Sequence, residues 1–227
     1  MSRSAFPPTP HTTFKRQPER GSYDRAAAEA ILDAAFLAHV GFVVDDQPIV
    51  MPMVHGRDGD RLLLHGSVAS RLLRALDRGA PVCVTVTLVD GLVLAHSHLH
   101  HSVNYRSVVI LGTARRVRDP GEQRRALACI VDHVVPGRAG ESRPATDAEL
   151  AQTMVLEVAI ETASVKTRAG GSALPDEADQ ALPIWSGVLP LTVAAGAPAA
   201  DDHASPVTGP PPSVSPWLRP GQAAPPA

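Results

Sequence analysis

The sequence contains only two cysteines, Cys83 and Cys129, among 227 residues. Cys83 lies in an apolar pattern typical of a strand, and Cys129 lies in one typical of a helix. Two such positions suit buried free thiols and exclude the disulfide framework of a small secreted domain. The sequence therefore predicts a reducing, cytoplasmic compartment.

Long apolar runs and an excess of one charge are also missing. No stretch of about 18 apolar residues could span a membrane, and the N-terminal MSRSAFPPTP has no signal-peptide core. The 21 Lys and Arg residues nearly balance the 23 Asp and Glu residues, which gives a net charge of -2. So small a charge attracts neither nucleic acid nor an acidic membrane surface, and we expect neither as a partner.

Length and proline content predict one folded domain between two unstructured ends. A chain of 227 residues, 44% of them hydrophobic, can enclose one well-buried core. Of its 22 prolines, eleven follow residue 182 and four precede residue 21. We expect a disordered arm over residues 1–19, a folded domain over 20–192 and a disordered Pro/Ala-rich tail over 193–227.

Short apolar runs separated by turn residues predict a mainly β domain with helices. We expect helices over residues 24–38, 69–76, 121–134 and 147–151, and strands over 40–44, 49–55, 61–65, 82–89, 92–96, 107–117 and 154–166. Asp90 and Gly91 form the predicted turn between two of these strands. About six antiparallel strands close most economically as a small barrel, because closure removes the unpaired edges.

Two segments combine apolar strand residues with Ser, His, Arg and Tyr. They are LLLHGSVASRLLRAL, residues 62–76, and HHSVNYRSVVILG, residues 100–112. Polar groups of these kinds are expensive to bury without partners, and they are suited to holding a phosphorylated aromatic ligand. We therefore look for function in these two segments.

Four segments in a fixed order resemble a known family: HVGFVVDDQPIVMPMVHGRDGDRLLLHGS, ASRLLRAL, HHSVNYRSVVILGTA and LPIWSGVLPL. The family is the pyridoxamine 5'-phosphate oxidase-like family, and the branch is that of flavin-nucleotide-binding proteins and nitroimidazole reductases. The resemblance implies an antiparallel six-stranded split β-barrel that forms a homodimer with FMN at the subunit interface. It also implies a flavin-dependent oxidoreductase for a small-molecule substrate, in which the flavin transfers the hydride or electrons.

An FMN site needs a cation and hydroxyl or backbone donors for the phosphate, together with an apolar slot for the ring. The resemblance assigns the phosphate to His65, Gly66, Ser67, Ser70 and Arg71. We expect Arg71 to clamp the phosphate. Many relatives have a lysine near this position, and an arginine keeps the charge while adding a second donor.

The resemblance also places Thr85, Tyr105 and Ser107 near the cofactor, with Trp185 as a lid or dimer contact. Trp185 could instead anchor the C-terminal segment to the barrel. Tyr105 and Ser107 share one face of the predicted strand, and Arg106 lies on the other.

Arg106 has two interpretations, since it could bind the phosphate or a carboxylate such as Glu157 or Glu161. No catalytic residue is assigned. Of the histidines, His65 or His55 is the better placed to donate a proton near the ring.

Four histidines, His96, His98, His100 and His101, suggest a metal. The first three would share one face of a strand, and imidazole is a good ligand for zinc, copper or haem iron. No cysteine or carboxylate cluster accompanies them, so we favour a loop or interface role and predict no metal site. A non-catalytic flavin carrier or sensor, a haem-binding split barrel, and F420 in place of FMN remain alternatives.

Overall fold

The computed structural model describes residues 4–173, 175, 177–201 and 210–217. In this part of the chain nine strands form one sheet, in the spatial order β1-β8-β6-β7-β4-β3-β2-β5-β9. The strands are β1 (Gly21–Ser22), β2 (Leu37–Val44), β3 (Gln47–Asp58), β4 (Arg61–Ser67), β5 (Pro81–Leu94), β6 (Ser102–Val117), β7 (Thr153–Ala159), β8 (Thr162–Arg168) and β9 (Gly187–Pro190).

Six of these strands close into a ring. β6 pairs with β7 on one side and with β5 on the other, so the order β5-β2-β3-β4-β7-β6 returns to its start. Every pair in the ring is antiparallel. The predicted fold class, an antiparallel six-stranded split barrel with helices, is confirmed.

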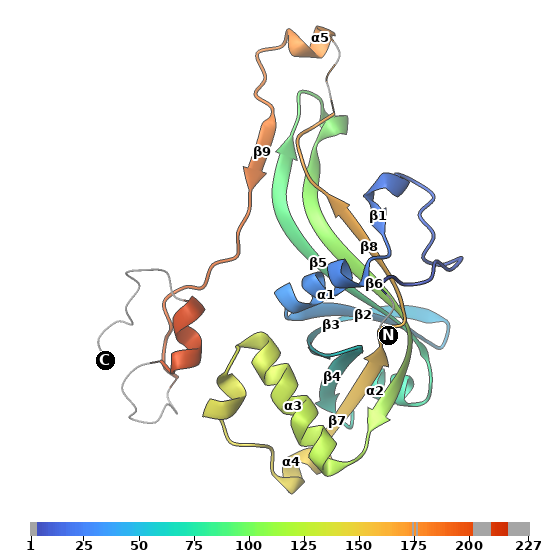
Figure 1. Ribbon diagram of the computed structural model, residues 1–227, viewed down its shortest axis with the longest axis vertical. Helices are drawn as coiled ribbons and strands as arrows, with labels where there is room; N and C mark the ends of the chain where they lie inside the picture. Colours follow the sequence, from blue (N-terminus) through green and yellow to red (C-terminus); the bar gives the residue numbers. More distant parts are fainter. Residues whose placement is uncertain (1–3, 174, 176, 202–209, 218–227) are drawn as a thin grey trace.

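Helices cover the ends of the ring (Figure 1). The α-helices are α1 (Arg25–Ala34), α2 (Arg71–Asp77), α3 (Pro120–Val134), α4 (Asp147–Gln152) and α5 (Glu177–Gln180), and the 3-10 helices are η1 (Pro18–Arg20), η2 (His98–His100), η3 (Arg138–Glu141) and η4 (Pro212–Trp217). Asp24, Ser70, Asp119 and Thr146 cap the first four α-helices by accepting a backbone N–H bond. No helix in the described ranges is long and apolar enough to cross a membrane.

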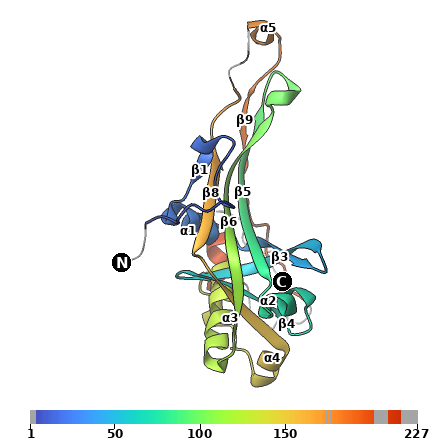
Figure 2. The ribbon, with the colours of Figure 1, turned by 90° about the vertical axis from the view of Figure 1, so that its right-hand side faces the viewer.

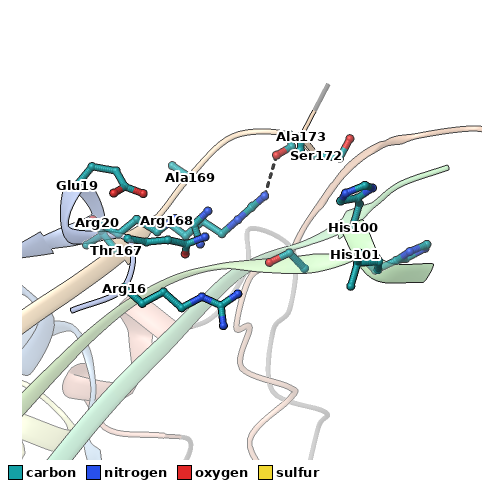
Figure 3. Close-up of a pocket in the computed structure, with 14 residues that line it drawn as sticks. Arg16, Glu19, Arg20, His100, His101, Thr167, Arg168, Ala169, Ser172 and Ala173 are labelled. Atoms are coloured by element: carbon teal, nitrogen blue, oxygen red, sulfur yellow. Dashed lines mark hydrogen bonds between the residues drawn. The ribbon is translucent and has the colours of Figure 1, made fainter. Parts of the chain in front are cut away.

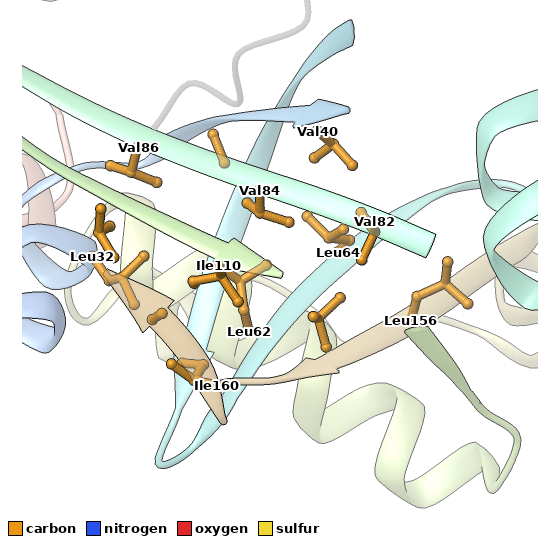
Figure 4. Packing of buried hydrophobic residues seen from close by; sticks show 14 of the residues in the cluster. Leu32, Val40, Leu62, Leu64, Val82, Val84, Val86, Ile110, Leu156 and Ile160 are labelled. Carbon is orange, nitrogen blue, oxygen red and sulfur yellow. The ribbon is translucent and has the colours of Figure 1, made fainter. Parts of the chain in front are cut away.

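Alternate strand residues fill the ring with aliphatic side chains (Figure 4). Val82, Val84 and Val86 of β5 and Ile110 of β6 are buried, as period-two alternation requires. Leu32 of α1 joins them in the same cluster. Each such side chain stabilises the fold by about 1.5–3 kcal/mol.

Two elements end earlier or later than the sequence indicates. The helix expected over residues 24–38 ends at Ala34, because β2 begins at Leu37 and places Ala38 and Val40 in the core. The strand expected over residues 154–166 is two strands, β7 and β8, with the break at Ile160. β7 pairs with β4, whereas β8 pairs with a more distant part of β6.

The turn expected at Asp90 and Gly91 is wrong. β5 continues through these residues with a bulge between Val89 and Gly91, and it pairs with β6 on both sides. The resulting hairpin projects far beyond the ring (Figures 1 and 2), with β8 and β9 at its sides. Gly91 admits β9, because a Cβ there would lie 3.0 Å from the carbonyl oxygen of Leu189. β6 accordingly starts at Ser102 rather than at Ser107.

The N-terminal segment, residues 4–20, lies against the barrel. Phe6 is 2% exposed and belongs to the main core. Its N–H donates to the carbonyl of Tyr23 at 2.8 Å, and the Arg25 guanidinium stacks 4.4 Å from its ring centre. We had expected an arm without structure over residues 1–19, of which 1–3 lie outside the described residues. A buried aromatic side chain makes residues 4–20 part of the folded unit.

The segment after β9 contacts the barrel at one described place. The N–H and Oγ of Ser213 donate to Glu141 at 3.1 and 2.5 Å. Of the expected tail over residues 193–227, residues 202–209 and 218–227 lie outside the described residues.

We expect deletion of everything after Leu191 to lower the Tm by no more than about 4 °C, because an exposed polar contact contributes about 1 kcal/mol or less. Thermal melts of the full and shortened chains test this expectation. A much larger drop would show that the tail is part of the folded unit.

Candidate functional site

The residues assigned to the phosphate lie together where β4 ends and α2 begins. Ser70 caps α2 by accepting the N–H of Leu73 at 3.4 Å, and the Ser67 hydroxyl accepts the N–H of Ala69 at 3.1 Å. Arg71 is exposed and has no hydrogen bond or ion pair in the described part of the chain. Its guanidinium is therefore free to bind an anion.

His65 and Gly66 precede this turn on β4. The His65 ring is half-buried, and its Nδ1 atom is buried with no hydrogen-bond partner in the described residues. Burial lowers the pKa of His65, which favours the neutral ring. At Gly66 a Cβ would lie 2.9 Å from Cδ1 of Leu73, so the glycine lets α2 pack closely on β4. The pair thus combines a packing residue with a ring nitrogen that could accept or donate a bond.

The other assigned residues lie elsewhere, along the projecting hairpin. The Ser107 and Thr87 hydroxyls are hydrogen-bonded at 3.0 Å across β5 and β6, and Thr85 and Tyr105 pair with neighbouring strand residues. β6 reaches α2 only at its far end, where Arg116 approaches Asp77 at 3.4 Å. At about 3.3 Å per residue, Ser107 and Arg116 are roughly 30 Å apart along the strand. One protomer therefore presents the predicted residues as two separate groups.

Arg106 meets a carboxylate that the sequence did not indicate. Its Nε and Nη2 atoms donate to the two carboxylate oxygens of Asp90 at 2.9 and 2.7 Å. These bonds lower the pKa of Asp90. Glu157 instead accepts from Arg61 and Arg115. The phosphate role would require Arg106 to leave Asp90.

His55 is far from any surface ligand. Its side chain is fully buried, with Nε2 3.3 Å from the Leu32 carbonyl oxygen and the ring centre 4.7 Å from that of His133. Desolvation, followed by the neighbouring His133, lowers the pKa of His55 to about 4. The suggestion that His55 donates a proton to a flavin is therefore wrong, because the ring faces the interior between α1 and α3.

Trp185 and the histidines lie at the far end of the hairpin. Trp185 is 66% exposed and directly precedes β9, whose Gly187 pairs with Leu94. The expected shared strand face for His96, His98 and His100 is wrong, because β5 ends at Leu94 and the last two lie in η2. Within the described ranges, no three His, Cys, Asp or Glu side chains are placed to hold a metal.

A pocket of about 670 Å³ lies beside this hairpin and was missed by the sequence analysis (Figure 3). Three segments line it: the N-terminal segment with Arg16 and Arg20, the hairpin tip with His100 and His101, and the end of β8 with Arg168. The sequence signal was the pair of aromatic residues around these arginines, since the Phe14 and Tyr23 rings pack 5.3 Å apart and fix the segment. The expectation of a disordered arm hid this signal.

Comparisons with known proteins identify relatives along most of the chain. Residues 24–167 match the family model described as pyridoxamine 5'-phosphate oxidase. No curated protein matches the sequence significantly. The structure of an FAD and haem binding protein from Mycobacterium smegmatis is 38% identical, with a TM-score of 0.82, covering 87% of this chain and 97% of that one.

Two further structures are similar. The flavocytochrome Anf3 from Azotobacter vinelandii is 37% identical, with a TM-score of 0.84, covering 92% of this chain and 97% of its own. A protein from Bacteroides thetaiotaomicron, provisionally assigned to 5-nitroimidazole antibiotic resistance, is 26% identical, with a TM-score of 0.55, covering 64% and 85%. Together with the strand ring and the match to the family model, these similarities show that the chain belongs to the flavin-binding pyridoxamine 5'-phosphate oxidase family.

Proposed function

We propose that this protein is a cytoplasmic flavin-dependent oxidoreductase that acts on a small molecule. The observation that carries the proposal is the similarity to two structures, 38% and 37% identical and each covered over 97% of its length. One is described as binding FAD and the other as a flavocytochrome. A bound flavin would supply the hydride or electron transfer, and the protein would supply binding and orientation.

The β4 to α2 turn fits the phosphate end of a flavin nucleotide. Arg71 has a free guanidinium, and Ser67 and Ser70 place hydroxyl groups beside the backbone N–H groups of the first turn of α2. The unpartnered Nδ1 atom of His65 is a further polar group that a ligand could satisfy. FMN and FAD share this phosphate, so this contact serves either flavin.

We further propose that a homodimer completes the site. The outer face of β2 and β3 exposes apolar side chains, with Val43 at 54% and Val50 at 61%. A second copy covering this face would shield a flavin ring from water, and Trp185 of one protomer would close over it. Sedimentation should report a dimer that becomes tighter on flavin addition. A monomer that binds flavin tightly at every protein concentration would contradict the shared site.

Arg71→Ala tests the phosphate assignment. Loss of a charge-assisted contact with a dianion should weaken FMN binding by about 10-fold to more than 100-fold. The matched control is Arg78→Ala, which removes the same charge from the opposite end of α2. Fluorescence titration measures both affinities. If Arg71→Ala binds FMN as tightly as the parent protein while remaining folded, Arg71 is not the clamp.

Haem binding is a second candidate function. The hairpin tip carries four histidines within residues 96–101, and the Nδ1 atom of His96 is buried without a partner in the described residues. Leu99, 86% exposed, and Trp185 add apolar surface at the same end of the hairpin. Haem-loaded protein should show a Soret band that His96→Ala shifts or abolishes. A flavin carrier or sensor would instead bind flavin without turnover, and F420 would give a deazaflavin spectrum.

A further inference from the structure

The pocket beside the hairpin has two cations that the protein itself does not use. Arg16 and Arg20 line it, and neither has a hydrogen bond or ion pair in the described part of the chain. Glu19 is the carboxylate in the lining. Between the arginines, Gln17 has a left-handed backbone, with φ 53° and ψ 58°, and starts η1. This turn brings both guanidinium groups to one wall of the pocket.

Arg168, the third arginine of the pocket, has a structural task. Its Nη1 atom donates to Oδ1 of the buried Asn104 at 2.5 Å and to the Gly170 carbonyl at 3.2 Å, and Nη2 donates to the Gly171 carbonyl at 2.8 Å. These bonds hold the loop that follows β8 as a second wall. Arg168 therefore shapes the pocket, and Arg16 and Arg20 are available to a ligand.

The opposite side of the pocket has a different chemistry. His100 and His101 lie across from the arginines (Figure 3), and Leu99 beside them is 86% exposed. Ser97 fixes both rings, since its hydroxyl contacts His100 Nδ1 at 2.8 Å and its carbonyl oxygen contacts His101 Nδ1 at 2.9 Å. Fixed imidazole rings and an apolar side chain offer a surface on which a flat base can stack.

We propose that this pocket binds a nucleoside diphosphate. Two guanidinium groups match two adjacent phosphates, and the histidine side matches the base. A pocket of about 670 Å³ lies within the range of small-molecule sites. Its largely polar lining suits a diphosphate better than it suits a haem ring, which needs an apolar slot. The site is separate from the Arg71 turn, because it lies by the opposite end of β6.

Calorimetric titration of the full chain with ADP tests the proposal. The parent protein should bind ADP, and Arg16→Ala combined with Arg20→Ala should weaken binding by at least about 10-fold. Lys15→Ala is the matched control, because Lys15 precedes Arg16 but does not line the pocket. Arg16→Ala alone, at an exposed position, is a second variant if the double variant is unstable. The proposal is overturned if the parent protein does not bind ADP, or if Lys15→Ala weakens binding equally.

Two further ligands test the nucleoside and its source. Inorganic pyrophosphate should bind at least about 10-fold more weakly than ADP, and equal affinity would refute base recognition. If the diphosphate is part of FAD, the double variant should weaken FAD binding and leave FMN binding unchanged. If it is part of a nicotinamide donor, NADH binding should weaken instead. Arg71→Ala should leave ADP binding unchanged, so failure of the flavin proposal and failure of this one give different results.

Discussion

Phe6→Ala should lower the free energy of unfolding by about 3–5 kcal/mol, the range for truncating a buried aromatic residue. Phe6 is 2% exposed, packs in the main core and lies under the Arg25 guanidinium. Urea denaturation of both proteins measures the difference. Phe14→Ala, at a half-buried position in the same segment, is the control and should have a smaller effect. A loss below about 1 kcal/mol for Phe6→Ala would show that the N-terminal segment is not part of the core.

Acid should destabilise the protein through His55. The pKa of this buried ring falls from its ordinary 6.5 to about 4 in the folded state. Between these two values the unfolded chain binds a proton that the folded chain does not, so stability falls as the pH drops from about 6.5 toward about 4. The contribution reaches up to about 3 kcal/mol at the acid end of this window.

The groups around His55 keep their charge states over most of this window. Asp33 is held ionised, because the Arg57 guanidinium lowers its pKa, and the His133 ring lies 4.7 Å away. Urea denaturation at a series of pH values measures the slope of stability against pH. His55→Gln should flatten this slope, since glutamine does not titrate. A variant with the same slope as the parent protein would assign the acid sensitivity to other groups.

The sequence predicted the barrel because its signal is local. Val82, Val84 and Val86 alternate with polar neighbours, and this period of two identifies a strand with one buried face. Closure of the ring then follows from the need to pair strand edges. Helix caps such as Ser70 and Asp119 are also local, and they fix where α2 and α3 begin.

Features that depend on distant contacts could not be predicted in this way. Asp90 and Gly91 are a turn signal, yet β9 pairs beside them and keeps β5 extended. The bond between Arg106 and Asp90 exists only because of the resulting register. Phe6 is an isolated aromatic residue among prolines and threonines, so no periodicity indicated its burial.

The candidate sites divide along the same line. Arg71, Ser67 and Ser70 are close in sequence, and their grouping at the start of α2 was predictable from the chain alone. The pocket joins Arg16, His100 and Arg168, which come from three distant parts of the sequence. It becomes visible only when β8 and the N-terminal segment are placed beside the hairpin.

Flavin loading of the purified protein tests the central proposal most directly. The protein is unfolded, refolded and dialysed against FMN or FAD, and its absorption spectrum and flavin content are then measured. Because the Arg71 guanidinium is free and the fold belongs to a flavin-binding family, we expect stoichiometric flavin with a spectrum distinct from that of free flavin. A protein that regains its thermal transition yet retains neither FMN nor FAD would contradict the proposed function.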